Sequence, residues 1–300
     1  MRKKILIFGG SGFIGSSLVK QFLEQKQQVC VICSNKAKAI DKLGNNLLGL
    51  EIKVIDIFNE DEIVNLVKDY DVIINLIGKL FEAKKGDFFK FHHEFPKLLS
   101  QSISSTQHLI HISALGVEKS SITSIYAKTK LAGQEAVIKN CKNYNIIKPS
   151  IVFGDHDNFF NLFSKIAKIS PFLPLIGGGK TKFSPIYVED LAKSIVFLTE
   201  NNKKYQNQIF ESHGPDTSSF KELMQFILKI KGRKRLLINL PFPLAKLQAN
   251  LINLLKIYLL TPDQVELLKY DNIASHEYNN IDMIIGNLNP YTEIVPKYLN

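Results

Sequence analysis

The sequence has 300 residues, of which 45% are hydrophobic and 22% charged, a composition typical of a soluble globular chain of one large or two ordinary domains. No run reaches the roughly 20 apolar residues that a membrane-spanning helix needs, and the early apolar run at 5–8 continues into a glycine loop rather than a cleavage site. The net charge of +10 comes from scattered lysines without a nucleic-acid-binding signature, so we expect no nucleic-acid partner.

The cysteines are few and odd in number, which points to a reducing compartment, most simply a cytoplasm. Cys30 and Cys33 lie in one apolar run, where the alternation of a strand directs the two thiols to opposite faces. No cluster of metal-ligating residues accompanies them. We therefore expect neither disulfide nor metal chemistry.

Short apolar runs alternate with amphipathic stretches in the first half of the chain, as in a parallel sheet with helices on both faces. Helices are predicted at 15–25 and 61–69, and a further helix begins near Ser124 and carries Tyr126 and Lys130. The predicted strands are 4–9, 28–33, 52–57, 71–78, 108–114 and 145–154. The expected fold is α/β, a doubly wound parallel Rossmann sheet, with the NAD(P)-binding domain over 1–155.

Beyond residue 155 the rhythm of strands and helices changes. A smaller α/β region, woven into the Rossmann domain and able to bind a substrate or a partner, is expected over 156–300. Its predicted elements are a helix at 157–169, a loop at 170–180, a strand at 183–188, a helix that returns to the sheet, strand–helix–strand from 208 to 241, a long apolar helix at 244–260, and loops to the end.

A glycine loop, FGGSGFIG, follows the first strand at the start of a helix. Gly9 permits a tight turn, Gly12 lets the backbone approach a pyrophosphate, and Gly15 lets the helix pack close to the strand. The N-terminus of the helix supplies amide donors to the phosphates. In this context the triplet predicts a bound dinucleotide, with Phe13 and Ile14 in the same site.

The end of the second strand distinguishes NAD from NADP, because a carboxylate there binds ribose hydroxyls and a cation accommodates an extra phosphate. Residues 33–38 contain no carboxylate, and Ser34 and Lys36 offer donors, although the lysine also reads as a solvated helix residue. NADP(H) is therefore favoured, with NAD(H) as the alternative. Asp56, expected at the end of the third strand beside Ile57, is placed to accept a hydrogen bond from adenine or is an exposed strand-end acid.

A series of motifs resembles, in order, those of the extended and atypical short-chain dehydrogenase/reductases: FGGSGFIG, Asp56, NLIG at 75–78, HISALG at 111–116, YAKTK at 126–130 and KPSIVFG at 148–154. Three tail segments, 173–192, 213–228 and 260–272, resemble the branch with the NAD(P)H-binding alpha-subcomplex accessory subunit of respiratory complex I and its bacterial relatives, which is similar to NAD-dependent epimerases and dehydratases. The resemblance covers nearly the whole chain.

The resemblance implies a role for each matching residue. Tyr126 would donate or accept a proton beside the nicotinamide, and Lys130 would hold the ribose and lower the pKa of the tyrosine, because a nearby cation favours phenolate. One helical turn places the two on the same face. Asn75 and Gly78 would flank the nicotinamide ribose, and Pro149 would lie near the carboxamide.

One position departs from the family pattern. Ala114 aligns with the Ser or Thr that normally holds the substrate oxygen, which leaves Ser113 one residue earlier and, by alternation, on the other face unless a bend brings it in. Losing such a donor costs roughly 10²–10³ in rate. The resemblance therefore implies a bound cofactor and leaves turnover open.

Two interpretations follow. The first is an accessory or assembly-type subunit associated with respiratory complex I, located in the cytoplasm or peripherally on the inner face of the membrane, whose C-terminal region contacts other subunits or the membrane surface. The second is an active NAD(P)-dependent reductase or epimerase that uses Tyr126, Lys130 and Ser113 on a small carbonyl or nucleotide-linked substrate. His92 and His93 are expected as a partly buried pair at a helix start, and His111 as a core histidine.

Overall fold

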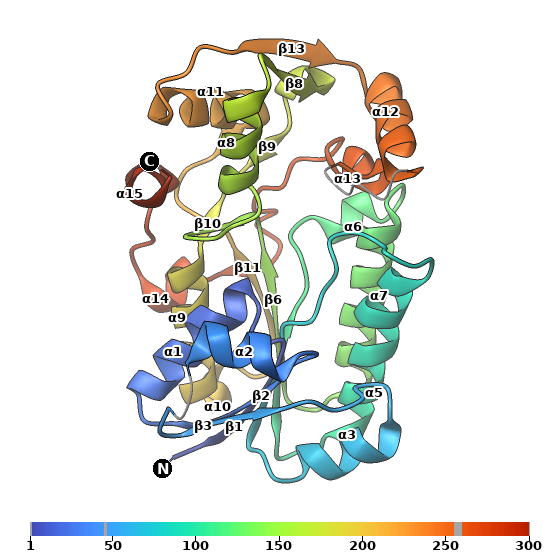
Figure 1. Ribbon diagram of the computed structural model, residues 1–300. Helices are drawn as coiled ribbons and strands as arrows, with labels where there is room; N and C mark the ends of the chain where they lie inside the picture. Colours follow the sequence, from blue (N-terminus) through green and yellow to red (C-terminus); the bar gives the residue numbers. More distant parts are fainter. Residues whose placement is uncertain (1, 45–46, 255–259, 300) are drawn as a thin grey trace.

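The computed structural model describes residues 2–44, 47–254 and 260–299, and its centre is an eight-stranded sheet (Figure 1). The strand order is β14-β11-β6-β5-β4-β1-β2-β3, and the strands pair in parallel. Read from β3 to β6, this is the doubly wound order of a Rossmann sheet. The predicted fold class is confirmed.

The strands of this sheet are short apolar segments, and helices cover both of their faces. β4 and β5 are buried along their whole length, as continuous apolar runs in a parallel sheet require. The bounds are β1 Lys4–Phe8, β2 Gln28–Ile32, β3 Leu50–Lys53, β4 Val72–Asn75, β5 His108–Ile112, β6 Tyr144–Pro149, β11 Gln208–Ser212 and β14 Asn279–Asn280.

Alternation along each strand sends its side chains into two cores. In β1, Ile5 and Ile7 pack with Leu18 of the helix after it, whereas Leu6 and Phe8 join the core on the other face. The first face carries α1 (Phe13–Glu24), α2 (Lys36–Leu43), α9 (Val188–Glu200), α10 (Asn202–Tyr205) and α14 (Asp282–Ile285). The second carries α3 (Glu60–Val67), a π-helix (Lys90–Glu94), α5 (Phe95–Ser102) and α7 (Ile125–Asn140), with α4 (Asp87–Phe89) and α6 (Val117–Ser120) beside α7.

The cysteines follow the same division. Cys30 belongs to the core beneath α3 and α5, and Cys33 to the core beneath α1 and α9. The two thiols therefore lie on opposite faces of the sheet, as predicted. All three cysteines are free and buried.

The C-terminal region lies above the carboxyl ends of the main strands (Figure 1) and has a core of its own around Phe160, Leu223, Met224 and Val295. α9 packs against α1 on the first face of the sheet, while the division into two regions at residue 155 stays a prediction. The remaining elements are β7 Val152–Phe153, α8 Phe160–Ile169, β8 Phe172–Ile176, a 3-10 turn Gly177–Gly179, β9 Lys182–Phe183, β10 Ile186–Tyr187, β12 Ser218–Ser219, α11 Phe220–Ile230, β13 Leu236–Leu240, α12 Phe242–Leu254, α13 Pro262–Leu267 and α15 Tyr291–Tyr298.

Several predicted elements are wrong in their bounds. The third strand is 50–53 rather than 52–57, because this edge strand pairs with β2 alone over four residues and the chain then turns toward α3. The strand predicted at 145–154 breaks after Pro149 into β6 and β7. The segment predicted as a loop at 170–180 contains β8, because residues 172–176 pair with β13. The tail predicted as loops contains α13, α14 and α15, the first of them begun by a capping box of Thr261 and Gln264. The predicted helix at 244–260 is α12, and its residues 255–259 lie outside the described chain.

Candidate functional site

The glycine loop joins β1 to α1 in a turn that only small residues allow. Gly9 has a positive φ of 82°, and the amide of Gly12 donates to the carbonyl oxygen of Gly9 at 2.9 Å. A Cβ on Gly15 would lie 2.4 Å from that same oxygen, and one on Gly10 would lie 2.7 Å from a methyl of Val31. Sequence reasoning missed Gly10, which lies outside the fingerprint but is held against β2.

The first turn of α1 presents its backbone amides without competition from side chains. Gly12 is the N-cap, no side-chain cap is present among the described residues, and the turn that begins with Phe13 and Ile14 has no acidic residue. Orphan amides and the positive end of a helix dipole together suit a phosphate group. This turn therefore fits the pyrophosphate of a dinucleotide.

The end of β2 presents exposed donors. Ser34 and Lys36 are both exposed, and Lys36 is the first residue of α2. Asn35 between them caps that helix, because its side-chain oxygen accepts the amide of Lys38 at 3.0 Å. A hydroxyl and an ammonium are thus exposed at the end of β2, and the preference for NADP over NAD stays a prediction.

Asp56 was predicted at the end of the third strand, and this position is wrong. It lies three residues beyond β3, in the turn to α3. One of its carboxylate oxygens accepts the amide of Phe58 at 3.0 Å, and its own amide donates to Glu62 at 3.2 Å. Ile57 beside it packs against the core under α3. The turn itself uses one oxygen of Asp56, and the contact with adenine stays a prediction.

The loop after β4 is held by Asn75. This buried residue ends the strand, its side-chain oxygen accepts the amide of Ile77 at 3.0 Å, and its NH₂ group donates to Nδ1 of His111 at 3.2 Å. Three residues on, a Cβ at Gly78 would lie 3.3 Å from Nζ of Lys130. Asn75 therefore shapes the loop, and Gly78 leaves room beside the lysine.

Tyr126 and Lys130 lie on the first turns of α7, which begins at the N-cap Ser124. Lys130 is buried, and its Nζ donates to the carbonyl of Ile112, the last residue of β5, at 2.9 Å. Burial lowers the pKa of Lys130 to about 8. The lysine predicted to hold ribose thus lies at the carboxyl edge of the sheet, beside Gly78.

The pKa of Tyr126 moves in the direction opposite to the one predicted. Burial, and next the charge of Asp263, raise the pKa of this half-buried phenol to about 12. Its ring meets those of Phe88 and His92 edge-on, with centroids 5.6 and 5.1 Å away. In this apolar pocket with a carboxylate nearby the neutral phenol is favoured over phenolate.

Ser113 continues the β5 ladder by one residue, because its amide donates to the carbonyl of Ile147 at 2.9 Å. Leu109 of β5 belongs to the core that α7 covers, and Ser113 lies four residues further along the strand. Alternation therefore directs the side chain of Ser113 to the face that α7 covers and that of Ala114 to the other face. The hydroxyl of Ser113 is buried and has no hydrogen-bond partner in the part of the chain that the structure describes. An orphaned donor at this edge is suited to a ligand oxygen.

His92 is a site residue whose burial was missed. It was predicted as one of a partly buried pair at a helix start, but it lies fully buried in the π-helix, while His93 is half-buried. Its Nε2 accepts the amide of Lys79 at 2.9 Å, and its Nδ1 lies 3.1 Å from the hydroxyl of Thr129, which itself donates to the α7 backbone. This neutral histidine ties the loop after β4 to the Tyr126–Lys130 turn.

The other predicted residues fall in the same region. Pro149 is buried at the end of β6, and its carbonyl accepts the amide of Leu115 at 3.0 Å. His111 was expected to be a core histidine with both ring nitrogens hydrogen-bonded. Its Nδ1 accepts from Asn75, but its buried Nε2 has no partner among the described residues. The structure thus gathers Gly9, Asn75, Gly78, Ser113, Lys130 and Pro149 at the carboxyl ends of β1, β4, β5 and β6, where doubly wound sheets bind ligands.

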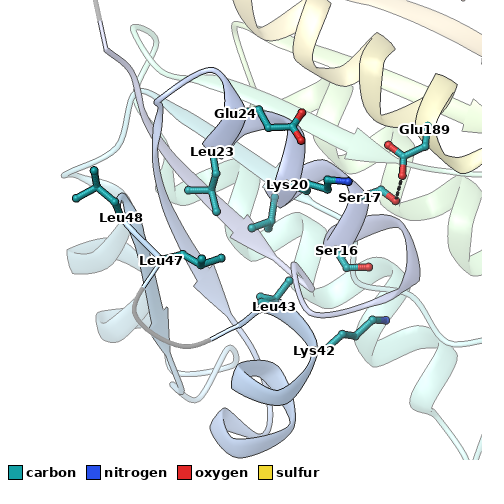
Figure 2. A pocket seen from close by; sticks show the side chains of 11 residues that line it. Ser16, Ser17, Lys20, Leu23, Glu24, Lys42, Leu43, Leu47, Leu48 and Glu189 are labelled. Atoms are coloured by element: carbon teal, nitrogen blue, oxygen red, sulfur yellow. Dashed lines mark hydrogen bonds between the residues drawn. The ribbon is translucent and has the colours of Figure 1, made fainter.

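Two cavities lie outside this group. One of about 530 Å³, shown in Figure 2, lies between α1, α2 and α9, where Glu189 accepts the hydroxyl of Ser17 at 2.8 Å. The other, of about 430 Å³, lies between the start of α7 and the α12–α13 pair, with Ile125, Lys246 and Asp263 in its wall. Neither contains the glycine loop.

Two further findings concern metals and membranes. Within residues 2–44, 47–254 and 260–299, no group of three or more His, Cys, Asp and Glu side chains is placed to hold a metal ion. None of the helices in those ranges combines the length and apolar character that crossing a membrane requires.

The strand order, the glycine loop and the Tyr126–Lys130 turn together define a Rossmann protein of the short-chain dehydrogenase class. Residues 5–211 match the model of the NAD dependent epimerase/dehydratase family. The chain belongs to this family, which confirms the resemblance drawn from its motifs.

Curated relatives extend the likeness beyond the family model. The chain is 30% identical to the NADH dehydrogenase (ubiquinone) 1 alpha subcomplex subunit 9, mitochondrial, of Arabidopsis thaliana, over 95% of this chain and 75% of the relative. It is 26% identical to the Dictyostelium discoideum protein of that name, over 74% of this chain but 62% of the relative. It is also 23% identical to the Ceramide reductase of Caulobacter vibrioides, over 81% of this chain and 75% of the relative.

A solved structure agrees with the fold. A dTDP-glucose 4,6-dehydratase from Bacillus anthracis in complex with NAD has a TM-score of 0.74 and 14% identity, over 99% of this chain and 95% of that chain. At this identity the likeness concerns the fold alone.

Proposed function

We propose that this protein is an NADP(H)-binding accessory or assembly-type subunit of a respiratory NADH dehydrogenase, complex I. The supporting observation is how far the likeness extends. The family model ends at residue 211, whereas the likeness to the Arabidopsis thaliana subunit covers 95% of the chain and so includes most of the C-terminal region. A shared C-terminal region favours a shared place of assembly over a shared nucleotide site alone.

The residues at the carboxyl edge of the sheet fit a nicotinamide dinucleotide. The amides of the α1 turn would hold the pyrophosphate, and Lys130 and Gly78 would lie beside the nicotinamide ribose. Ser34 and Lys36, exposed at the end of β2, would hold the additional phosphate of NADP. A bound nicotinamide ring supplies hydride transfer; in the accessory role its contribution is structural.

The structural contribution follows from linkage. A nucleotide that binds the folded chain alone stabilises it by about 2.7 kcal/mol at a hundredfold excess over Kd. The same ligand would contact the glycine loop, the loop after β4 and the start of α7, which meet at the carboxyl edge of the sheet. Binding would thus favour the form of the protein that assembles.

The C-terminal region offers an apolar surface for assembly. On α12, Leu244, Leu247 and Leu251 are 54, 57 and 58% exposed, and their spacing places them on one face of the helix. Leu236 on β13, the strand before α12, is 71% exposed. Lys246, a lysine of this helix, donates to Glu266 at 2.6 Å, so the leucines and not this ammonium are the candidate contact.

The test removes this face. The triple variant Leu244→Gln, Leu247→Gln and Leu251→Gln should release the chain from a large respiratory assembly when gently solubilised membranes are run on a native gel. The matched control replaces three exposed apolar residues on the Rossmann half with Gln: Leu48, Val54 and Met283, which are 96, 52 and 71% exposed. A wild-type chain found wholly in the soluble fraction, away from any assembly, would reject the proposal.

A second candidate function is an active NAD(P)-dependent reductase or epimerase on a small carbonyl or nucleotide-linked substrate. The observation that favours it is the orphaned hydroxyl of Ser113 at the edge of the sheet where Lys130 lies. With its pKa raised to about 12, Tyr126 holds its proton at neutral pH and would donate it to a carbonyl oxygen that Ser113 positions. Carbonyl-dependent oxidation of bound NADPH by the purified protein would support this function.

A further inference from the structure

The N-terminus of α7 is capped from the far end of the chain. The carboxylate of Asp263 accepts the hydroxyl of Ser124 at 2.8 Å, the amide of Ile125 at 2.7 Å and the amide of Tyr126 at 3.1 Å. The hydroxyl oxygen of Ser124 accepts the next amide, that of Ala127, at 3.1 Å. Ser124 and Asp263 together satisfy three of the four amides that a helix leaves free at its start.

Asp263 is held by a helix that contacts two neighbours. It lies on the first turn of α13, which starts with the capping box of Thr261 and Gln264. The side chain of Gln264 donates to the carbonyl of Leu80 in the loop after β4, at 3.4 Å. Glu266 accepts Lys246 of α12 at 2.6 Å, so α13 connects the start of α7 to the helix with the exposed leucines.

The same tail segment reaches the ends of two more strands through Asn272. Its NH₂ group donates to the carbonyl of Leu115, just beyond β5, at 2.9 Å. Its side-chain oxygen accepts the hydroxyl of Ser150, just beyond β6, at 2.6 Å. Residues 261–272 therefore connect the loops after β4, β5 and β6 with the start of α7, at the edge where the nucleotide site lies.

We propose that Asp263 is a positioning residue of the nucleotide site, through which the C-terminal region fixes the α7 turn that carries Tyr126 and Lys130. This inference rests on the nucleotide-binding part of the proposed function. It adds that the C-terminal region regulates the binding of the nucleotide. Because α13 packs on α12, contact with a partner at the leucines of α12 and binding of the nucleotide would reinforce each other. In the described part of the chain, Asp263 of α13 contacts the amide of Tyr126, His92 of the π-helix contacts its ring, and Lys130 lies one turn further along α7.

The test uses the full chain and two variants. Asp263→Ala removes both the cap and the charge, and NADPH binding by calorimetry should weaken about 2- to 30-fold, the range expected for loss of a helix cap. Asp263→Asn removes the charge and keeps one of the two acceptor oxygens, so it should weaken binding less than Asp263→Ala does. The control is Ser219→Ala, which removes the capping box of α11 far from this site and should leave affinity unchanged.

A spectroscopic readout separates positioning from general stability. Alkaline titration of tyrosinate absorbance, with Tyr126→Phe as the reference, reports the phenol of Tyr126. Both Asp263 variants should titrate at lower pH than wild type, because the negative charge of Asp263 raises the pKa of the Tyr126 phenol, whereas Ser219→Ala should not. Unchanged affinity in Asp263→Ala together with an unchanged titration would overturn the inference. A wild-type chain that binds neither NADPH nor NADH would overturn the proposed function instead, and the titration would still decide the place of Asp263.

Discussion

Lys130 donates the hydrogen bond of its ammonium to the carbonyl of Ile112, 2.9 Å away, and so lies fixed between α7 and the end of β5. Burial lowers its pKa from 10.5 to about 8. The site therefore contains a cation that the folded chain holds against its own desolvation cost, as a group kept for a ligand would be.

This burial predicts how stability depends on pH. Between about pH 8 and 10.5 the unfolded chain keeps the Lys130 proton that the folded chain has lost, so the free energy of unfolding rises with pH across that window. In Lys130→Met this contribution is absent. We expect the stability difference between wild type and the variant to change by up to about 1.4 kcal/mol per pH unit in urea titrations without nucleotide. A pH-independent difference would contradict the burial of a charged lysine.

The end of β2 predicts the cofactor preference. NADPH should bind more tightly than NADH, because Ser34 and Lys36 offer donors where a carboxylate would repel the extra phosphate. Ser34→Asp should shift the preference toward NADH by at least about tenfold. Lys42→Gln, in the last turn of α2, lowers the net charge by the same single unit and serves as the charge-matched control. Calorimetric titration of both nucleotides measures this, and equal affinities in wild type would refute it.

The sequence predicted correctly those features of the fold that depend on short local patterns. The apolar runs of β1, β4 and β5 and the glycines at 9, 12 and 15 are readable one segment at a time, and both the sheet and the turn follow them. The edge strand β3 was misplaced because its side chains are only half-buried, so apolar runs do not mark its register.

The site features that were missed depend on residues far apart in the sequence. The burial of His92 requires α7 to approach the π-helix closely at Gly133, where a Cβ would lie 1.8 Å from the carbonyl oxygen of His92. The cap of α7 by Asp263 joins residues 138 positions apart. The pKa of Tyr126 depends on both packing and that cap, so one turn of helix could not predict its direction.

Tyr126→Phe separates the two proposed functions. In an enzyme, the change should remove turnover by at least about 10²-fold, because proton transfer contributes that much or more, while NADPH affinity stays within about threefold. In an accessory subunit, nucleotide binding and membrane association should both be unchanged. Stopped-flow oxidation of bound NADPH with carbonyl compounds measures the first, and turnover that survives in the variant would show that another group transfers the proton.

Three buried histidines predict acid sensitivity. Burial lowers the pKa of His92 to about 2, of His108 to about 4 and of His111 to about 3, so the folded chain keeps all three neutral above about pH 4. Below about pH 6.5 the unfolded chain protonates them, and each proton taken up by the unfolded chain alone lowers the free energy of unfolding by about 1.4 kcal/mol per pH unit. Stability should therefore fall steeply between about pH 6 and 4.5, and His111→Gln should reduce the slope by about one third.

The control is His156→Gln, at a side chain that is 81% exposed, which should leave the slope unchanged. Urea midpoints measured across this range decide the matter, and equal slopes for wild type and His111→Gln would mean that His111 titrates freely in the folded protein.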